Sequence, residues 1–128
     1  MTTIEHLNKI KAKCEQLLAI AEKRTPGTWH KTRYASTRIE NNNERQVAAC
    51  GGHTSTVNAE AVELENHANT TFIASCAGPA EAGWRSTIAA IDLLLFNNER
   101  MSYGYAQSKQ ERQIIQSILS AWPEEILN

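Results

Sequence analysis

The stretch Ala21-Glu22-Lys23-Arg24-Thr25-Pro26-Gly27-Thr28-Trp29 decides how the chain is organised. It ends a segment that carries an apolar stripe, and it begins a run in which bulky and polar residues alternate. Thr25 precedes a proline and is therefore disfavoured in helical geometry. Pro26-Gly27 fits the centre of a type II turn, because Pro fixes φ at the first site and Gly accepts positive φ at the second. The junction predicts a helix, a tight turn and a strand in succession.

Before the junction, one helix is expected from about Thr3 to Lys23. Thr2 or Thr3 can cap its N-terminus, and Lys23 and Arg24 are assigned to its last turn, where cations suit the helix dipole. Its apolar residues recur at three- and four-residue steps, which predicts one buried side: Ile4, Leu7, Ile10, Cys14, Leu17, Leu18 and Ala21.

After the junction, a small antiparallel sheet of three strands is expected. The strands are Trp29–Ala35, Thr37–Glu40 and Gln46–Cys50. The polar cluster Asn41–Glu44 is assigned to a hairpin turn, since Asn tolerates left-handed geometry. Gly51-Gly52 is expected to end the sheet.

Two further helices are expected on either side of Gly78-Pro79, where Gly caps one helix and Pro begins the next. The first covers residues 58–77, although residues 54–66 could be helix or loop. The second runs to about Phe96, and Asn97–Gln107 is expected to be a loop. Residues 91–96 are apolar nearly all round, which is typical of a helix buried on two sides.

The last helix is predicted from a capping box, Ser108 with Glu111, followed by Ile114, Ile115, Ile118, Leu119 and Trp122 on one side. Pro123 stops it, and Ile126-Leu127 forms an apolar tail. The predicted strands therefore follow one another in the sequence and are not interleaved with the helices. This order indicates an α+β fold with two to three helices on one face of a small sheet. A length of 128 residues fits a single domain over residues 1–128.

Composition limits the possible functions. The net charge of -1 gives no basic field of the kind that nucleic-acid binding requires, although the first 50 residues are basic and the rest acidic. No apolar run suits a membrane span and no export signal is present, so we expect a cytoplasmic protein without membrane contact. Three cysteines argue against a disulfide framework, and Cys14 and Cys76 are expected to be buried thiols.

Two segments are similar to small phage and prophage accessory proteins, in particular the lambdoid early accessory group. One is the junction Ala21–Trp29, which resembles an A-E-x-x-T-P-G-P-W pattern with Thr28 in place of Pro. The other is Ala68–Ala77, which resembles an N-A-x-F-I-A helix. The resemblance covers roughly residues 15 to 95 and supplies no catalytic residues. It implies a phage origin, a host cytoplasmic setting and a dispensable role directed at the host.

The sequence gives little support for a catalytic site or a metal site. No Gly-rich phosphate loop, paired-carboxylate motif or H-E-x-x-H signature is present, so we expect neither an enzyme nor a cofactor. Cys50-Gly51-Gly52-His53 has the spacing of two zinc ligands, but a structural site needs four ligands. We favour a strand-ending turn with a surface histidine and no metal. Cys50 is also the least implausible thiol nucleophile, without a supporting motif.

A basic and aromatic strand offers one alternative function. Trp29, Lys31 and Arg33 would share one strand face, and with Arg38 they could hold a nucleotide-like anion or single-stranded nucleic acid. Too few charges cluster for binding driven by phosphates, so a solvated face with Trp29 anchored in the core is preferred.

Protein binding is the favoured function. The predicted loop after the third helix carries Arg100, Met101, Tyr103 and Tyr105, which are residue types common at interfaces. We expect a non-enzymatic accessory protein that binds a host protein in host takeover or counter-defence, with these four residues as contacts. The apolar segments 91–96 and 126–127 favour a homodimer.

Overall fold

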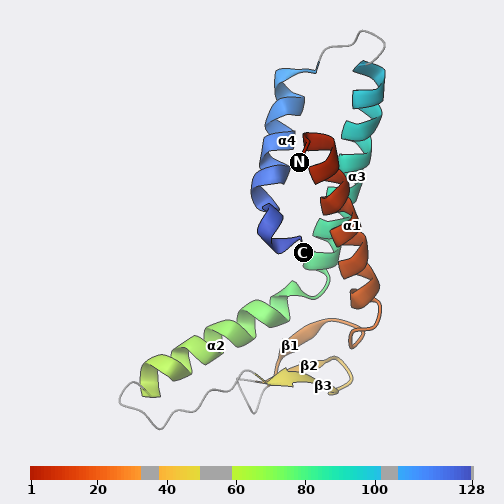
Figure 1. Ribbon diagram of the computed structural model, residues 1–128. Coiled ribbons are helices and arrows are strands. Elements are labelled where there is room, and N and C mark those ends of the chain that lie inside the picture. The colour runs from red at the N-terminus through yellow and green to blue at the C-terminus, as the bar shows by residue number, and fades with distance from the viewer. Residues whose placement is uncertain (33–37, 50–58, 102–106, 128) are drawn as a thin grey trace. The chain divides into compact units, whose positions relative to one another are not determined.

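The computed structural model describes residues 1–32, 38–49, 59–101 and 107–127, and confirms the α+β fold (Figure 1). An N-terminal helix leads into a three-stranded antiparallel sheet, and three more α-helices follow. In chain order the elements are α1 (Thr3–Ala21), β1 (Trp29–Lys31), β2 (Arg38–Asn41), β3 (Gln46–Ala49), α2 (Ala59–Cys76), α3 (Pro79–Met101), α4 (Lys109–Ala121) and the 3-10 helix η1 (Glu124–Ile126).

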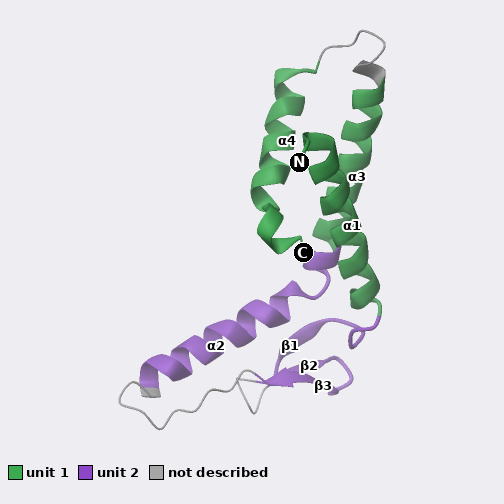
Figure 2. Cartoon of the chain, viewed as in Figure 1, with its two compact units in different colours: residues 1–22, 82–128 green, residues 23–81 purple. Residues whose placement is uncertain are grey.

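The chain divides into two compact units (Figure 2). Unit 1 comprises Met1–Glu22 and Ala82–Asn128 and contains α1, most of α3, α4 and η1. Unit 2 comprises Lys23–Glu81 and contains the sheet and α2. A single domain over residues 1–128 stays a prediction.

Helix α1 begins as the sequence predicts. Thr2 is its N-cap: the Thr2 hydroxyl accepts from the backbone N–H of Glu5, and the Glu5 carboxylate accepts from that of Thr2, each at 3.1 Å. This reciprocal pair satisfies two backbone donors at the helix start. The helix ends at Ala21, with Glu22 as its C-cap, and not at Lys23 as expected. Lys23 and Arg24 therefore lie beyond the last turn.

The core of unit 1 forms where α1 meets α3. Leu7, Ile10 and Cys14 of α1 are buried together with Ile91 of α3. Partly buried residues from α3, α4 and the C-terminal tail surround this cluster: Trp84, Ile88, Leu95, Ile118, Leu119, Trp122 and Leu127. In the apolar tail, Leu127 packs against this core, whereas Ile126 is exposed.

A polar contact and an ion pair border this core. The His6 ring Nε2 donates to the backbone oxygen of Trp122 at 2.9 Å, which joins α1 to the end of α4. The Lys11 ammonium lies 2.7 Å from the Asp92 carboxylate, and this hydrogen bond raises the pKa of Lys11. Both side chains of the ion pair are substantially exposed, so its contribution to stability is small.

Helix α3 is longer than expected. It continues through Asn97 to Met101, so the prediction of a loop from Asn97 to Gln107 is wrong for its first five residues. These residues include neither Gly nor Pro, and Asn weakens a helix only modestly. The expected burial on two sides is also wrong within the unit. Ile91 is fully buried, while Leu93 is 61% and Phe96 is 55% exposed.

Helix α4 is capped by Ser108, whose hydroxyl accepts from the backbone N–H of Glu111 at 3.1 Å. This is the forward bond of the predicted capping box. Ile115 is buried on the inner side of the helix, and the neighbouring Ile114 is exposed. The helix ends at Ala121, two residues before Pro123, as the proline predicts.

In unit 2 the strands pair in the order β1-β2-β3, both pairs antiparallel. Lys31 lies opposite Ile39 and Trp29 opposite Asn41, and the pairing of β2 with β3 is irregular between Ile39 and Glu40. Helix α2 packs against β1 and β2. Of the helices expected on one face of the sheet, α2 is the one that covers it within this unit.

The first strand is shorter than expected, because β1 ends at Lys31 and the described Thr32 lies outside it. β2 runs one residue further than expected, to Asn41, and β3 is described from Gln46 to Ala49. Residues 33–37, Cys50 and Gly51-Gly52 lie outside the described residues. The left-handed residue of the hairpin is Glu44, with φ 60°, and not one of the asparagines.

The boundary between α2 and α3 agrees with the sequence. Gly78 adopts φ 94°, which an L side chain rarely does, and Pro79 is the first residue of α3. α2 begins at Ala59, so residues 59–66 of the ambiguous segment 54–66 are helical. Residues 54–58 lie outside the described residues.

Truncation of a side chain is expected to affect stability differently on the two sides of α3. Ile91→Ala removes a fully buried side chain and is expected to lower the free energy of unfolding by about 2–5 kcal/mol. Leu93→Ala truncates an exposed side chain and is expected to stay within about 0.5 kcal/mol of the wild type. Urea denaturation measures both changes. Equal losses for the two variants would contradict the assigned orientation of α3.

The thiols predict a difference in reactivity. Burial raises the pKa of the Cys14 thiol and so removes its reactive thiolate, while Cys76 is only half-buried. In a Cys50→Ser variant, a thiol reagent is expected to modify Cys76 in the native protein and Cys14 only after unfolding. If the reagent modified Cys14 and Cys76 at equal rates in the native protein, Cys14 would lie outside the core.

Candidate functional site

The residues considered for a metal site or a thiol nucleophile, Cys50 and His53, lie outside the described residues. Within the described ranges, no group of three or more His, Cys, Asp and Glu side chains could hold a metal ion.

The basic strand is divided between two faces of the sheet. The register pairs Lys31 with Ile39 and Trp29 with Asn41, so Trp29 and Lys31 share the face that includes these buried residues. Arg38 alternates with Ile39 along β2 and therefore lies on the other face. Arg33 lies outside the described residues. The four predicted anion ligands are therefore not brought together on one described face.

The indole of Trp29 is already engaged at the junction. Its ring N–H donates to the backbone oxygen of Thr25 at 2.9 Å, and the Arg24 guanidinium lies 5.2 Å from the ring centroid. Arg24 also donates to Glu81 at 2.5 Å and to the backbone oxygens of Thr25 and Gly27 at 2.8 and 3.0 Å. Sequence reasoning assigned Arg24 to a helix dipole and missed this role. It is a structural site that fixes the turn.

Asn41 is a second structural centre that sequence reasoning missed. Its side chain is buried, and its amide nitrogen donates to the backbone oxygen of Pro26 at 3.1 Å. Its amide oxygen accepts from the backbone N–H groups of Asn43 and Arg45, each at 3.0 Å. One side chain therefore joins the Pro-Gly turn to the β2–β3 hairpin. The signal available in the sequence was an Asn at the start of a turn.

Asn41→Ala is expected to cost about 1–3 kcal/mol, because three part-buried hydrogen bonds between the buried Asn41 side chain and the backbone are lost. The exposed neighbour provides the control: Asn42→Ala is expected to change stability by less than about 0.5 kcal/mol. Amide hydrogen exchange gives a local measurement, and the amides of Asn43 and Arg45 are expected to exchange faster in the first variant alone. Unchanged exchange at both amides would contradict the assigned bonds.

The predicted partner contacts lie at the end of α3. Arg100 and Met101 are its last two residues and so belong to a helix and not to a loop. Tyr103 and Tyr105 lie outside the described residues. Arg100 stands four residues after Phe96, about one helical turn beyond an exposed aromatic side chain.

The most distinctive exposed surface of unit 1 is a stripe that we call the outer face of α3. It consists of Ala82, Ala89, Leu93 and Phe96, all exposed. Their spacings of seven, four and three residues return to nearly the same side of a helix with 3.6 residues per turn. Ile91, on the opposite side, is fully buried. Helix α3 thus carries apolar side chains on two sides, and the packing within unit 1 buries only the side of Ile91.

Two grooves flank the contact between α3 and α4. One, of about 450 Å³, is lined on α4 by Arg112, Ile115 and Gln116 and reaches the start of α1. The other, of about 560 Å³, has Ile114 and Ile118 on its α4 wall and three small residues on its α3 wall: Ser86, Thr87 and Ala90. Because Ser86 lies seven residues before Leu93, the second groove runs beside the outer face of α3.

Comparisons with protein-family models, with curated proteins and with solved structures give no match for this chain. The resemblance to phage accessory proteins therefore stays an expectation from its two motifs. Among the described residues, no helix has both the length and the apolar character needed to cross a membrane.

Proposed function

We propose that the protein acts by binding another protein through the outer face of α3. The observation that carries this proposal is the exposure of Leu93 and Phe96 on a helix whose other side forms the core. Large apolar side chains that gather on one stripe differ from scattered exposed ones, because a partner helix can cover them together.

The surroundings of the outer face suit an interface. Polar residues border the stripe, including Arg85 and Ser86, and Asp92 holds the Lys11 ammonium at one edge. Protein interfaces commonly have such a polar rim around an apolar centre. On the other edge, the groove with Ile114 extends the apolar surface onto α4. Ala82 and Ala89 add small residues that allow a partner backbone to approach closely.

The partner that the resemblance implies is a host protein, bound in host takeover or counter-defence. Arg100 and Met101, two of the contacts expected from the sequence, are the last two residues of the same helix. The proposal needs no catalytic residue. A nucleotide-like ligand is a weaker candidate, because Arg38 and Lys31 lie on different faces of the sheet.

Capture from host-cell lysate tests the proposal. The double variant Leu93→Ser/Phe96→Ser is expected to recover the partner at least roughly tenfold less than the wild type, since truncated anchors at an interface centre commonly cost more than 1 kcal/mol each. Ile20→Ser is the matched control, because Ile20 is 60% exposed on α1.

The control is expected to recover the same partner as the wild type. Circular dichroism should show equal helix content in all three proteins, since none of the substituted side chains is buried. Undiminished recovery by the folded double variant would contradict the proposal.

A further inference from the structure

A second exposed apolar surface lies on α2, in unit 2. Leu64 and Phe72 are 67% and 70% exposed, the highest values among the large apolar side chains described. Ala68, also exposed, stands midway between them. We call Leu64, Ala68 and Phe72 the α2 ridge, because residues four apart form a continuous row along a helix surface.

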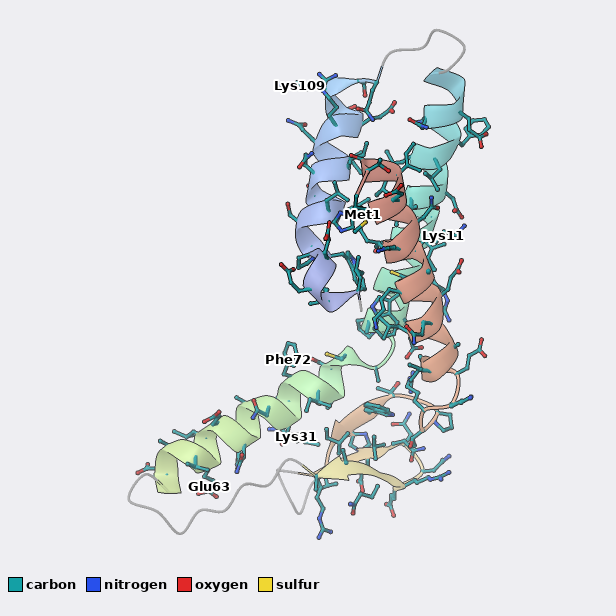
Figure 3. The ribbon with its side chains drawn as sticks, viewed as in Figure 1. Met1, Lys11, Lys31, Glu63, Phe72 and Lys109 are labelled. Carbon is teal, nitrogen blue, oxygen red and sulfur yellow. The ribbon has the colours of Figure 1, made fainter. Side chains whose placement is uncertain are left out.

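The ridge faces away from the sheet. Helix α2 contacts β1 and β2, and its buried residues are Thr70 and Ala74, which lie four apart on one side. At 100° per residue, Ala68 and Phe72 lie about 160° from Thr70 in either direction, on the opposite side, and Leu64 lies about 120° from Thr70, on the flank of the helix. Figure 3 shows Phe72 standing off the helix away from the strands. The packing that holds α2 in unit 2 therefore leaves the ridge open.

We propose that the α2 ridge pairs with the α2 ridge of a second copy in an antiparallel, two-fold symmetric contact. The spacing is symmetric about Ala68: Leu64 precedes it by four residues and Phe72 follows it by four. With a two-fold axis at Ala68, Leu64 of each copy meets Phe72 of the other. Such a self-complementary patch is what an isologous dimer contact requires.

The geometry of helix packing agrees with this pairing. When rows of residues four apart interdigitate, two helices cross at about -50° with their axes about 8–10 Å apart. The closest approach occurs at the crossing point, where a small side chain is needed. Ala68 occupies that point, and the larger Leu64 and Phe72 fill the space on either side as the helices diverge.

The charges of α2 select the antiparallel direction. Glu60, Glu63 and Glu65 all lie in its first half, and residues 66–76 contain no Asp, Glu, Lys or Arg. A parallel pair would bring the two acidic halves together, where like charges repel. An antiparallel pair places each acidic half beside the uncharged half of its partner and also opposes the two helix dipoles.

The size of the contact sets the expected affinity. A crossing of two helices over about two turns each buries less than the roughly 1,200–2,000 Å² of a standard interface. The dimer is therefore expected to be weak and reversible, and to form in the upper part of the micromolar range. This surface is separate from the outer face of α3, so the inference does not depend on the proposed function.

Sedimentation equilibrium of the full chain, from low micromolar to near-millimolar concentration, tests the pairing. The wild type is expected to shift from 14.3 kDa towards twice that mass. Leu64→Ser/Phe72→Ser is expected to dimerise at least roughly tenfold more weakly. Leu93→Ser/Phe96→Ser is the matched control and should dimerise like the wild type. All substituted side chains are exposed, so equal helix content by circular dichroism is expected.

Disulfide trapping tests the direction. In a Cys50→Ser/Cys76→Ser background, Ala68→Cys is expected to form a covalent dimer under mild oxidation. A mixture of Ala61→Cys and Ser75→Cys chains is treated with a flexible bismaleimide, because the crossing helices have diverged at these positions. It should form the mixed crosslink in preference to either homodimer, because positions 61 and 75 are equally spaced from Ala68.

Three outcomes would overturn the pairing: a wild type that stays monomeric throughout, a ridge variant that dimerises as well as the wild type, or Ala61→Cys homodimers in place of the mixed crosslink. A monomeric wild type whose capture of another protein depends on Leu64 and Phe72 would assign the ridge to that protein and not to a second copy.

Discussion

The packing of Ile91 against α1 is the contact on which the surface of unit 1 depends. Ile91 is fully buried with Leu7, Ile10 and Cys14, and this fixes the rotation of α3 about its axis. A helix is a stiff cylinder, so the burial of one side determines what the other side presents. Leu93 and Phe96 are exposed because Ile91 is not. The surface proposed for partner binding thus follows from the arrangement of the core.

Unit 2 is organised by polar contacts more than by apolar ones. Arg24 holds the junction through a cation-π contact with Trp29, backbone acceptors and Glu81, and Asn41 joins the Pro-Gly turn to the hairpin. Thr70 is buried on α2 and donates to a backbone oxygen within its own helix. A small sheet that is covered by one helix has little apolar surface to bury. Satisfied buried polar groups then define its geometry.

Local signals in the sequence predicted much of the fold. The Thr2 cap and the Gly78-Pro79 boundary act within one or two turns and are confirmed. Of the apolar stripe predicted for α1, Leu7, Ile10 and Cys14 are buried, whereas Ile4 is exposed. The extension of α3 to Met101 was missed, because its Asn residues permit both a loop and a helix. Arg24 also bonds to Glu81, 57 residues away, and Asn41 to Pro26, 15 residues away, and no local pattern reveals these two contacts. The sequence showed residues 91–96 to be apolar nearly all round, but it could not tell which side of this segment the chain itself would cover.

Site-specific photo-crosslinking tests most directly whether the outer face of α3 binds a protein. A photoreactive amino acid would replace Leu93 in one version of the full chain and the exposed Gln16 of α1 in another, each expressed in host cells. Position 93 is expected to give one abundant covalent adduct and position 16 none. The same adducts from both positions, or none from position 93 while the protein is folded, would rule out binding of a protein through the outer face of α3.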